Sequence, residues 1–143
     1  MRGTLRNLTV VAAIWPAAAL GACGGSDDKP APKLSDDTRG ILATVDALQT
    51  ASRDGDARRI CRELFTDTLA KSIRRASHLS CEAEVRDTLT APDARLSVGR
   101  DLEVKGSRAT ATVREQNGNT SVVSFVKEGD RWRIERVTPV KPK

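Results

Sequence analysis

Apolar side chains recur at helical spacing through residues 36–52, the first clearly patterned part of the folded region. The apolar positions are Ile41, Leu42, Val45, Leu48 and Ala51. Residues 41, 45 and 48 fall on one stripe of a helix, which predicts an amphipathic helix with one buried face. Ser35, Asp36 and Asp37 are favourable at a helix start, and Gly55 is typical of the left-handed residue that follows a helix end.

A second helical pattern begins at Asp56 and continues past residue 70. Its apolar positions are Ile60, Cys61, Leu64, Phe65, Leu69 and Ile73. We expect a break near Thr66-Asp67, because Thr and Asp favour cap positions over helix interiors. The segment from Ser80 to Thr90 predicts a further short helix, ended by Pro92, with Val85 and Leu89 facing inward.

The period changes from helical to alternating in the last third of the chain. Apolar and polar residues alternate over 108–114, 123–125 and 131–135, a pattern typical of half-buried strands. The turn signals between the strands are Lys105-Gly106, Asn117-Gly118 and Glu128-Gly129-Asp130. Together with Leu96 to Val104, the pattern predicts a curved sheet of four antiparallel strands in a meander, with the helices packed on it, which is an α+β fold class.

Aromatic residues are scarce, at 3% of the chain, and there is no tyrosine. A large aromatic-lined cofactor site is therefore not expected. Trp132 alternates with Arg131 and Arg133, so it faces the opposite side of its strand from these two charges. This alternation predicts that Trp132 is a core residue that shares its face with Ile134.

A different pattern occupies residues 1–22. Arg2 and Arg6 form a positive head, and a largely apolar run extends from Leu8 to Ala22. The run is shorter than the ~20 residues that a membrane-spanning helix needs, and Pro16 interrupts it. Residues 1–22 therefore predict a secretory signal peptide.

The end of this segment reads Leu20-Gly21-Ala22-Cys23 and resembles the lipobox of bacterial lipoproteins. The resemblance implies cleavage before Cys23, a diacylglycerol on the Cys23 sulfur, and an acyl chain such as palmitate on the new amino terminus. The implied location is the extracytoplasmic face of the cell membrane, where the acyl chains hold the protein as a lipid-anchored lipoprotein. An ordinary signal peptide with a chance cysteine, or an uncleaved anchor, is the alternative.

The mature chain divides into three parts on this interpretation. Residues 23–35 are the lipidated cysteine and a flexible tether, residues 36–138 are the folded domain, and residues 139–143 are a tail. The whole chain has a formal charge of +5, and loss of Arg2 and Arg6 with the signal peptide lowers it by two. This small positive charge does not predict nucleic-acid binding.

Cys61 and Cys81 remain once Cys23 carries lipid. Two thiols in an exported domain are expected to form a disulfide, which stabilises by roughly 3 kcal/mol for a loop of this length. A metal site would need more ligands, and the chain has a single histidine, His78. A redox or catalytic thiol, with His78 as the base three residues before Cys81, is the other alternative. We expect no metal and no cofactor.

Several short segments and the order of the elements point to one superfamily. These segments are Arg53-Asp54-Gly55-Asp56, Cys61, Cys81, Val104-Lys105-Gly106 and Lys127-Glu128-Gly129-Asp130-Arg131-Trp132-Arg133-Ile134. Over residues 36–138 the chain resembles the NTF2-like (SnoaL-like, cystatin-like) superfamily, in particular its small extracytoplasmic lipoproteins in bacteria. The resemblance implies a curved sheet that wraps the first helix into a cone, whose open end often forms a pocket. The candidate pocket or core residues are Leu64, Phe65, Val123, Phe125, Trp132 and Ile134.

Catalytic residues are not evident in this sequence. Enzymes of the resembled superfamily, such as ketosteroid isomerases and polyketide cyclases, use an Asp base with Tyr or an Asp–His pair. The chain has no Tyr, His78 lies in an expected loop, and Asp67, Asp87 and Asp101 have no recognisable spacing to a base. We therefore expect a non-catalytic module that binds a small ligand or an unknown envelope protein. The alternative is a small isomerase, cyclase or hydrolase that uses an Asp in the cone.

Five arginines lie on the outer face of the second helical pattern. The residues are Arg58, Arg59, Arg62, Arg74 and Arg75. The pattern leaves two interpretations open. The face is either a solvated helix surface or a surface that rests on anionic lipid.

Overall fold

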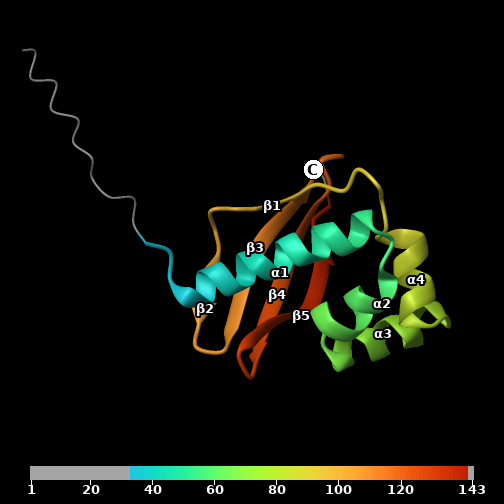
Figure 1. Ribbon diagram of the computed structural model, residues 1–143, viewed down its shortest axis with the longest axis horizontal. Helices are drawn as coiled ribbons and strands as arrows, with labels where there is room; N and C mark the ends of the chain where they lie inside the picture. The colour runs from blue at the N-terminus through green and yellow to red at the C-terminus, as the bar shows by residue number, and fades with distance from the viewer. Residues whose placement is uncertain (1–32, 142–143) are drawn as a thin grey trace, which may run out of the picture. The chain divides into compact units, whose positions relative to one another are not determined.

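The computed structural model describes residues 33–141 (Figure 1). The predicted signal peptide, Cys23, most of the predicted tether and the end of the predicted tail lie outside the described residues. Within residues 33–141, no helix has the length and apolar character needed to cross a membrane.

Residues 33–141 form four α-helices, one π-helical turn and five strands. In chain order these are α1 (Asp36–Arg53), α2 (Ala57–Arg59), the π-helical turn η1 (Ile60–Leu64), α3 (Asp67–Ser77), α4 (Cys81–Thr88), β1 (Leu96–Val98), β2 (Glu103–Lys105), β3 (Arg108–Glu115), β4 (Thr120–Glu128) and β5 (Arg131–Pro139). The helices precede an antiparallel sheet, so the predicted α+β class is confirmed.

One predicted strand was wrong. The segment from Leu96 to Val104 forms two short strands, β1 and β2, and both pair with β3, in a sheet of order β1-β3-β4-β5. Between them the Gly99 N–H donates to the Thr112 carbonyl of β3 over 2.7 Å. The Asp101 carboxylate then accepts from the Thr112 N–H (3.2 Å) and from the Thr112 hydroxyl (2.5 Å). These long-range bonds stabilise a turn that alternation alone does not reveal.

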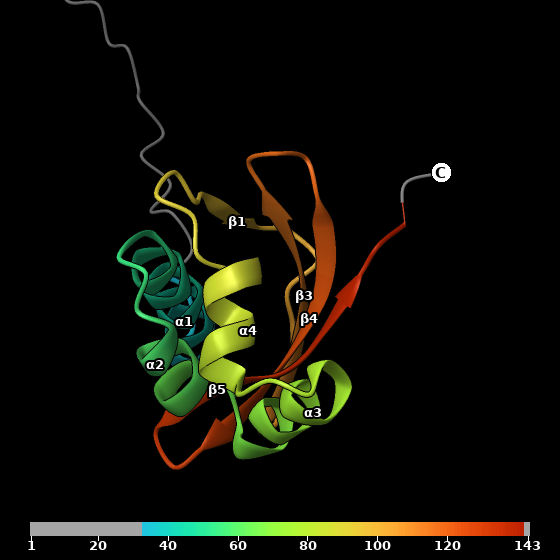
Figure 2. The same cartoon turned by 90° about the vertical axis from the view of Figure 1, so that its right-hand side faces the viewer.

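Helix α1 lies across one face of the sheet, and α2, α3 and α4 gather next to β5 (Figures 1 and 2). The Ser35 hydroxyl caps α1 by accepting the Thr38 N–H over 3.1 Å. The predicted stripe faces inward, and Ile41 and Val45 are buried. The first predicted helix and its cap are therefore confirmed.

The second helical pattern folds into three pieces. After the single turn α2, the Phe65 N–H donates to the Ile60 carbonyl over 2.9 Å, a spacing that makes η1 a π-helical turn. Phe65 is extended and bridges Ile134 of β5. Thr66 caps α3 by accepting the Leu69 N–H over 3.2 Å. The predicted break is thus confirmed, whereas the π-helical turn was not predicted.

The sheet turns one face toward the helices and buries it. Its buried residues are Ala109, Ala111, Val113, Val123, Phe125, Trp132 and Ile134. They occupy every second position of their strands, so the predicted alternation and the core position of Trp132 are confirmed. Val85 of α4 is buried as expected, but Leu89 is 37% exposed and does not pack inward.

Gly40 lets α1 approach the sheet over Trp132. A Cβ atom at Gly40 would lie 2.7 Å from Cδ1 of Trp132, which is itself buried. In an exposed helix Gly→Ala would stabilise by up to ~1 kcal/mol, but overpacking of a filled site costs about 1–3 kcal/mol. We therefore expect Gly40→Ala to lower the free energy of unfolding, measured by urea denaturation. A more stable variant would contradict the close packing of α1 on Trp132.

Candidate functional site

A cavity of about 490 Å³ opens on the helix-covered face of the sheet. It lies between the second half of α1, the end of α4 and the segment after it, the β3–β4 hairpin and the end of β5. Its apolar wall includes Val45, Leu48, Phe65, Val113, Val123 and Ile134. The volume falls within the range of small-molecule sites, which are mostly apolar with a few polar groups.

Each part of the apolar wall follows from local structure. Val45 and Leu48 lie three positions apart on α1, so both point from the same helix face. Val113 and Val123 occupy inward positions of β3 and β4. Phe65 reaches the wall because the chain becomes extended directly after η1. The π-helical turn therefore positions the one aromatic side chain of the cavity wall.

Hydrogen bonds to the end of α1 hold the segment 89–96 over the mouth of the cavity. The Ser52 hydroxyl donates to the Leu89 carbonyl, and the Ala91 N–H donates back to the Ser52 carbonyl over 3.1 Å. The Gln49 side-chain oxygen accepts the Leu96 N–H over 2.7 Å. These bonds attach the segment to the last turns of α1, and Leu96 also packs against the core. The space beneath the segment stays open.

Polar side chains line the rim of the cavity. Asp93 and Arg95 are exposed, and Glu115 accepts from the Asn117 side-chain amide over 2.9 Å. Leu89 and Val137, 37% and 41% exposed, are the apolar residues of the mouth. The arrangement suits a ligand with an apolar body, whose polar atoms remain at the rim.

The sequence-predicted pocket residues separate into three groups. Phe65, Val123 and Ile134 line the cavity. Leu64 and Trp132 instead line a shallower depression of about 270 Å³ beside Gly40. Phe125 is fully buried in the core and lines neither. Sequence reasoning missed Val45, Leu48 and Val113 as wall residues, although the helical stripe and the strand alternation had marked them as inward-facing.

Polar contacts close the other end of the helix–sheet layer. Asp37, in the first turn of α1, accepts from Nζ of Lys127 over 2.8 Å and from Nε1 of Trp132 over 3.3 Å. The hydrogen bond from Lys127 lowers the pKa of Asp37, and the same contact raises the pKa of Lys127. The two groups remain charged at neutral pH and tie the start of α1 to the β4–β5 hairpin.

The titratable candidates lie away from the cavity. His78 is exposed at the end of α3, in a left-handed conformation with φ of 61°. Asp67, Asp87 and Asp101 are not among the cavity-lining residues. Hydrogen bonds from Thr112 lower the pKa of Asp101, which favours its ionised form. Within residues 33–141 no group of three or more potential metal ligands comes together.

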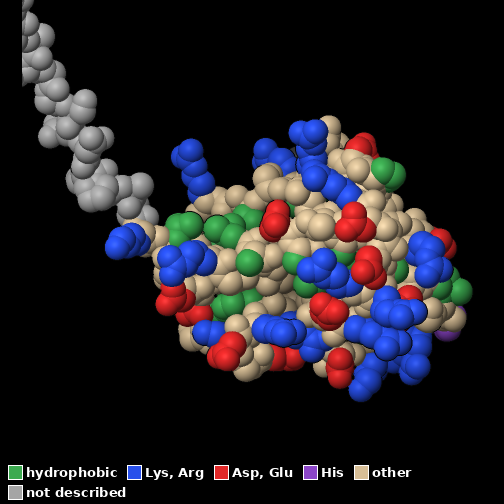
Figure 3. Space-filling model, in the orientation of Figure 1, with side chains coloured by type: hydrophobic (Ala, Val, Ile, Leu, Met, Phe, Trp, Pro, Cys, Tyr) green, Lys and Arg blue, Asp and Glu red, His purple; other side chains and the backbone are tan. Residues whose placement is uncertain are grey.

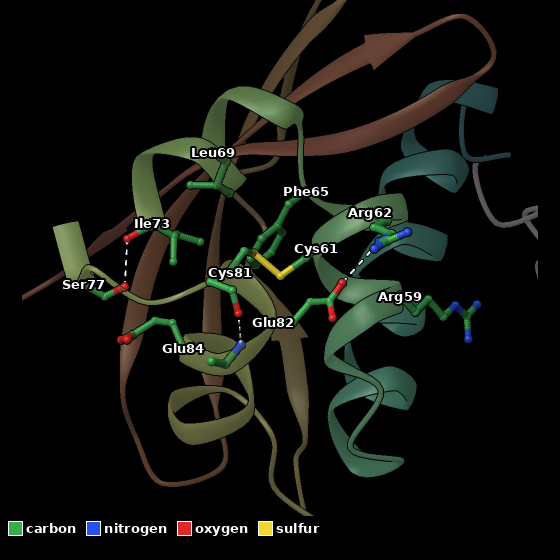
Figure 4. The surroundings of a disulfide bond; sticks show 12 residues. Arg59, Cys61, Arg62, Phe65, Leu69, Ile73, Ser77, Cys81, Glu82 and Glu84 are labelled. Atoms are coloured by element: carbon green, nitrogen blue, oxygen red, sulfur yellow. Dashed lines mark hydrogen bonds and ion pairs between the residues drawn. A yellow bond between two sulfur atoms is a disulfide. The ribbon is translucent and has the colours of Figure 1, made fainter. Parts of the chain in front are cut away.

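Cys61 and Cys81 are joined as a disulfide (Figure 4). Cys61 lies in η1 and Cys81 is the first residue of α4, and their Cα atoms are 6.1 Å apart. Leu69 and Ile73 of α3 lie close to this bridge in Figure 4. The bridge therefore holds α4 against the turn that positions Phe65.

Comparison with protein-family models, with curated proteins and with solved structures finds no match to this chain.

Proposed function

We propose that the chain is a membrane-anchored extracytoplasmic lipoprotein whose domain binds a small apolar ligand in the 490 Å³ cavity and catalyses no reaction. The signal-peptide pattern and the lipobox resemblance of Leu20 to Cys23 support the anchor. The long helix α1 on an antiparallel sheet, the break at residues 54–56 and a cavity at one end support an NTF2-like domain. A register shift between β4 and β5 is consistent with a curved sheet.

The cavity is the observation that carries the ligand-binding proposal. A domain that only contacts a partner protein would be expected to fill this end with Leu, Phe and Trp side chains. Here the lining is mostly apolar, the mouth is open, and the charged lining residues Asp93 and Arg95 are exposed. Burial of an apolar ligand against such a wall is favourable, at roughly 25 cal/mol per Å² of apolar surface removed from water.

A cavity-blocking substitution tests ligand binding. Val137→Trp places a large side chain at the mouth, and we expect it to weaken binding of the neutral fluorescent probe N-phenyl-1-naphthylamine by about tenfold or more, equivalent to ~1.4 kcal/mol. Fluorescence titration of the purified protein gives the dissociation constants. Val122→Trp is the matched control, because Val122 is similarly exposed (40% against 41%) but does not line the cavity. Equal affinities of the two variants, or no binding by the unaltered protein, would contradict the proposal.

The lipid anchor is tested at Cys23. Cys23→Ser removes the sulfur that would carry the diacylglycerol, so we expect the chain to leave the membrane fraction or to remain unprocessed. Cell fractionation and intact mass of the mature protein measure both outcomes. The two or three acyl chains of a lipoprotein contribute about 0.8 kcal/mol per buried CH₂. A correctly processed Cys23→Ser chain that stays on membranes without detergent would contradict lipidation at this residue.

The non-catalytic part of the proposal is supported by the residues around the cavity. General acid–base catalysis needs a titratable group held within hydrogen-bond reach of the substrate. The carboxylates that line the cavity, Asp93 and Glu115, lie at its rim, and the Glu115 carboxylate already accepts the Asn117 amide. An isomerase and esterase screen, repeated with Asp93→Asn, tests this part. A specific activity that falls a hundredfold in that variant would establish catalysis.

A further inference from the structure

Basic side chains gather on the surface of α2, η1 and α3, where Figure 3 shows Lys and Arg over these elements. We call this the basic helical surface and define it by its five exposed members. They are Arg58, Arg62, Lys71, Arg74 and Arg75. Three of them come from α3 at helical spacing, because positions 71, 74 and 75 lie on one face of a helix.

Most of this positive charge has no counter-charge in the fold. Arg62 pairs with Glu82 over 3.2 Å. Within residues 33–141 no ion pair involves Arg58, Lys71, Arg74 or Arg75. Three acids close in sequence to these cations have other contacts. Asp56 accepts the Arg59 N–H over 2.9 Å, Glu63 lies 3.8 Å from Arg59, and Asp67 lies 3.9 Å from Arg133. Four cations therefore remain available to an external anionic surface.

Contacts with β5, with α4 and with the core fix the elements that carry the basic helical surface. Arg133 of β5 donates to the carbonyls of Arg62 (2.7 Å) and Phe65, at the end of η1. The disulfide joins η1 to α4, and Leu69 and Ile73 attach α3 to the core. Lys71, Arg74 and Arg75 are exposed whereas Leu69 and Ile73 are partly buried, so α3 turns its basic side to solvent. Leu79, which is 46% exposed, lies two residues after the end of α3 and places an apolar side chain near the basic residues.

We propose that the basic helical surface binds an anionic phospholipid surface and holds the domain flat against its own membrane. The location rests on the proposed lipid anchor at Cys23. Nine residues lie between Cys23 and Lys33, so ten Cα–Cα steps join the two residues and reach at most about 35 Å. Helix α1, with 18 residues, is about 27 Å long. The tether is therefore long enough for the end of the domain remote from the start of α1 to reach the same membrane.

Electrostatic attraction favours this orientation once the anchor is inserted. Each Lys or Arg next to an anionic leaflet strengthens binding by about fivefold. The anchor keeps the domain near the membrane, so the effective concentration of its four cations at the lipid surface is high. Even individually weak contacts between these cations and the lipid headgroups therefore form. Arginine also pairs bidentately with phosphate oxygens, which adds to the contribution of its charge.

Arginine footprinting tests the proposal with the mature lipidated protein inserted into vesicles. The neutral reagent phenylglyoxal modifies accessible guanidinium groups, and peptide mass spectrometry gives the rate at each arginine. We expect the rates at Arg58 and Arg75 to fall about fivefold or more on vesicles of phosphatidylcholine with phosphatidylglycerol, relative to phosphatidylcholine alone. The rates at Arg100 and Arg114, which are exposed on the sheet side, should not change. Salt at ~1 M should restore the rates, since the Debye length is then about 3 Å.

Two matched double variants distinguish a contribution of the basic helical surface from an effect of net charge alone. Lys71→Ser with Arg74→Ser should reduce the protection of Arg58 and Arg75. Arg100→Ser with Arg114→Ser removes the same charge elsewhere and should leave the protection intact. Equal rates on the two kinds of vesicle would overturn the proposal and leave these cations to solvent or to another anionic partner. Intact mass reports the lipid on Cys23 separately, so loss of the anchor and loss of surface contact are distinguishable.

Discussion

Replacement of Trp132 by alanine is expected to lower the free energy of unfolding by about 3–5 kcal/mol, a typical value for truncation of a large buried aromatic residue. Trp132 is 4% exposed and packs against Gly40 of α1. Its Nε1 donates to Asp37 over 3.3 Å, and its carbonyl accepts from the Thr44 hydroxyl over 2.8 Å. The substitution removes both the apolar contact and the side-chain hydrogen bond that fasten the start of α1.

Urea denaturation followed by far-ultraviolet circular dichroism measures this loss. Arg131→Ala is the matched control, because Arg131 is the exposed neighbour on the opposite side of the same strand and should change stability by no more than ~0.5 kcal/mol. Trp15 lies in the predicted signal peptide, so Trp132 is the single tryptophan of the predicted mature chain. Red-shifted, easily quenched emission from Trp132 would contradict its burial and the strand alignment.

Loss of the Cys61–Cys81 disulfide is expected to lower the free energy of unfolding by about 2–5 kcal/mol. The bridge closes a loop with a sequence separation of 20 residues, and in the chain-entropy model it restricts the unfolded state. It also holds α4 to η1, while α3, which lies between them in the chain, has no fully buried residue. We expect α3 and α4 to open first when the bridge is absent.

Two forms of the protein distinguish the bridge from the packing of its side chains. Chemical reduction of the unaltered protein removes the bridge but keeps both side chains, whereas Cys61→Ala with Cys81→Ala removes both. Reduction should destabilise the unaltered protein and should not affect the double variant. Intact mass with and without reduction and alkylation reports the pairing. Two thiols that alkylate freely in the native, unreduced protein would count against it.

Local patterns were sufficient to predict most of the secondary structure. The stripe of Ile41, Val45 and Leu48 and the cap at Ser35 act within one or two helical turns, so sequence alone predicted α1. The turn signals around Gly106, Gly118 and Gly129 likewise predicted the loops that separate the later strands, because all three residues adopt positive φ.

Features that depend on contacts between distant residues were not predictable in the same way. The break between β1 and β2 depends on bonds from Gly99 and Asp101 to Thr112, a residue on another strand. The π-helical turn places Phe65 against Ile134, although the repeat of apolar residues there fits an ordinary helix equally well. Leu89 matched an inward position of its helix, yet α4 ends beside an open mouth and leaves it partly exposed.

The sequence by itself determined which side chains face inward, since the periods of helix and strand divide each element into a polar and an apolar face. Only the tertiary structure decided which of these inward residues pack together and which surround a space. Trp132 and Val123 share a face of the sheet, but α1 comes close over Trp132 because Gly40 lacks a side chain. At Val123 the segment 89–96 is hydrogen-bonded to the end of α1, and a cavity of about 490 Å³ remains between them and the sheet. The burial of Trp132 at one end of the sheet and the cavity at the other end thus follow from the position of α1. The local spacing of apolar residues does not determine that position.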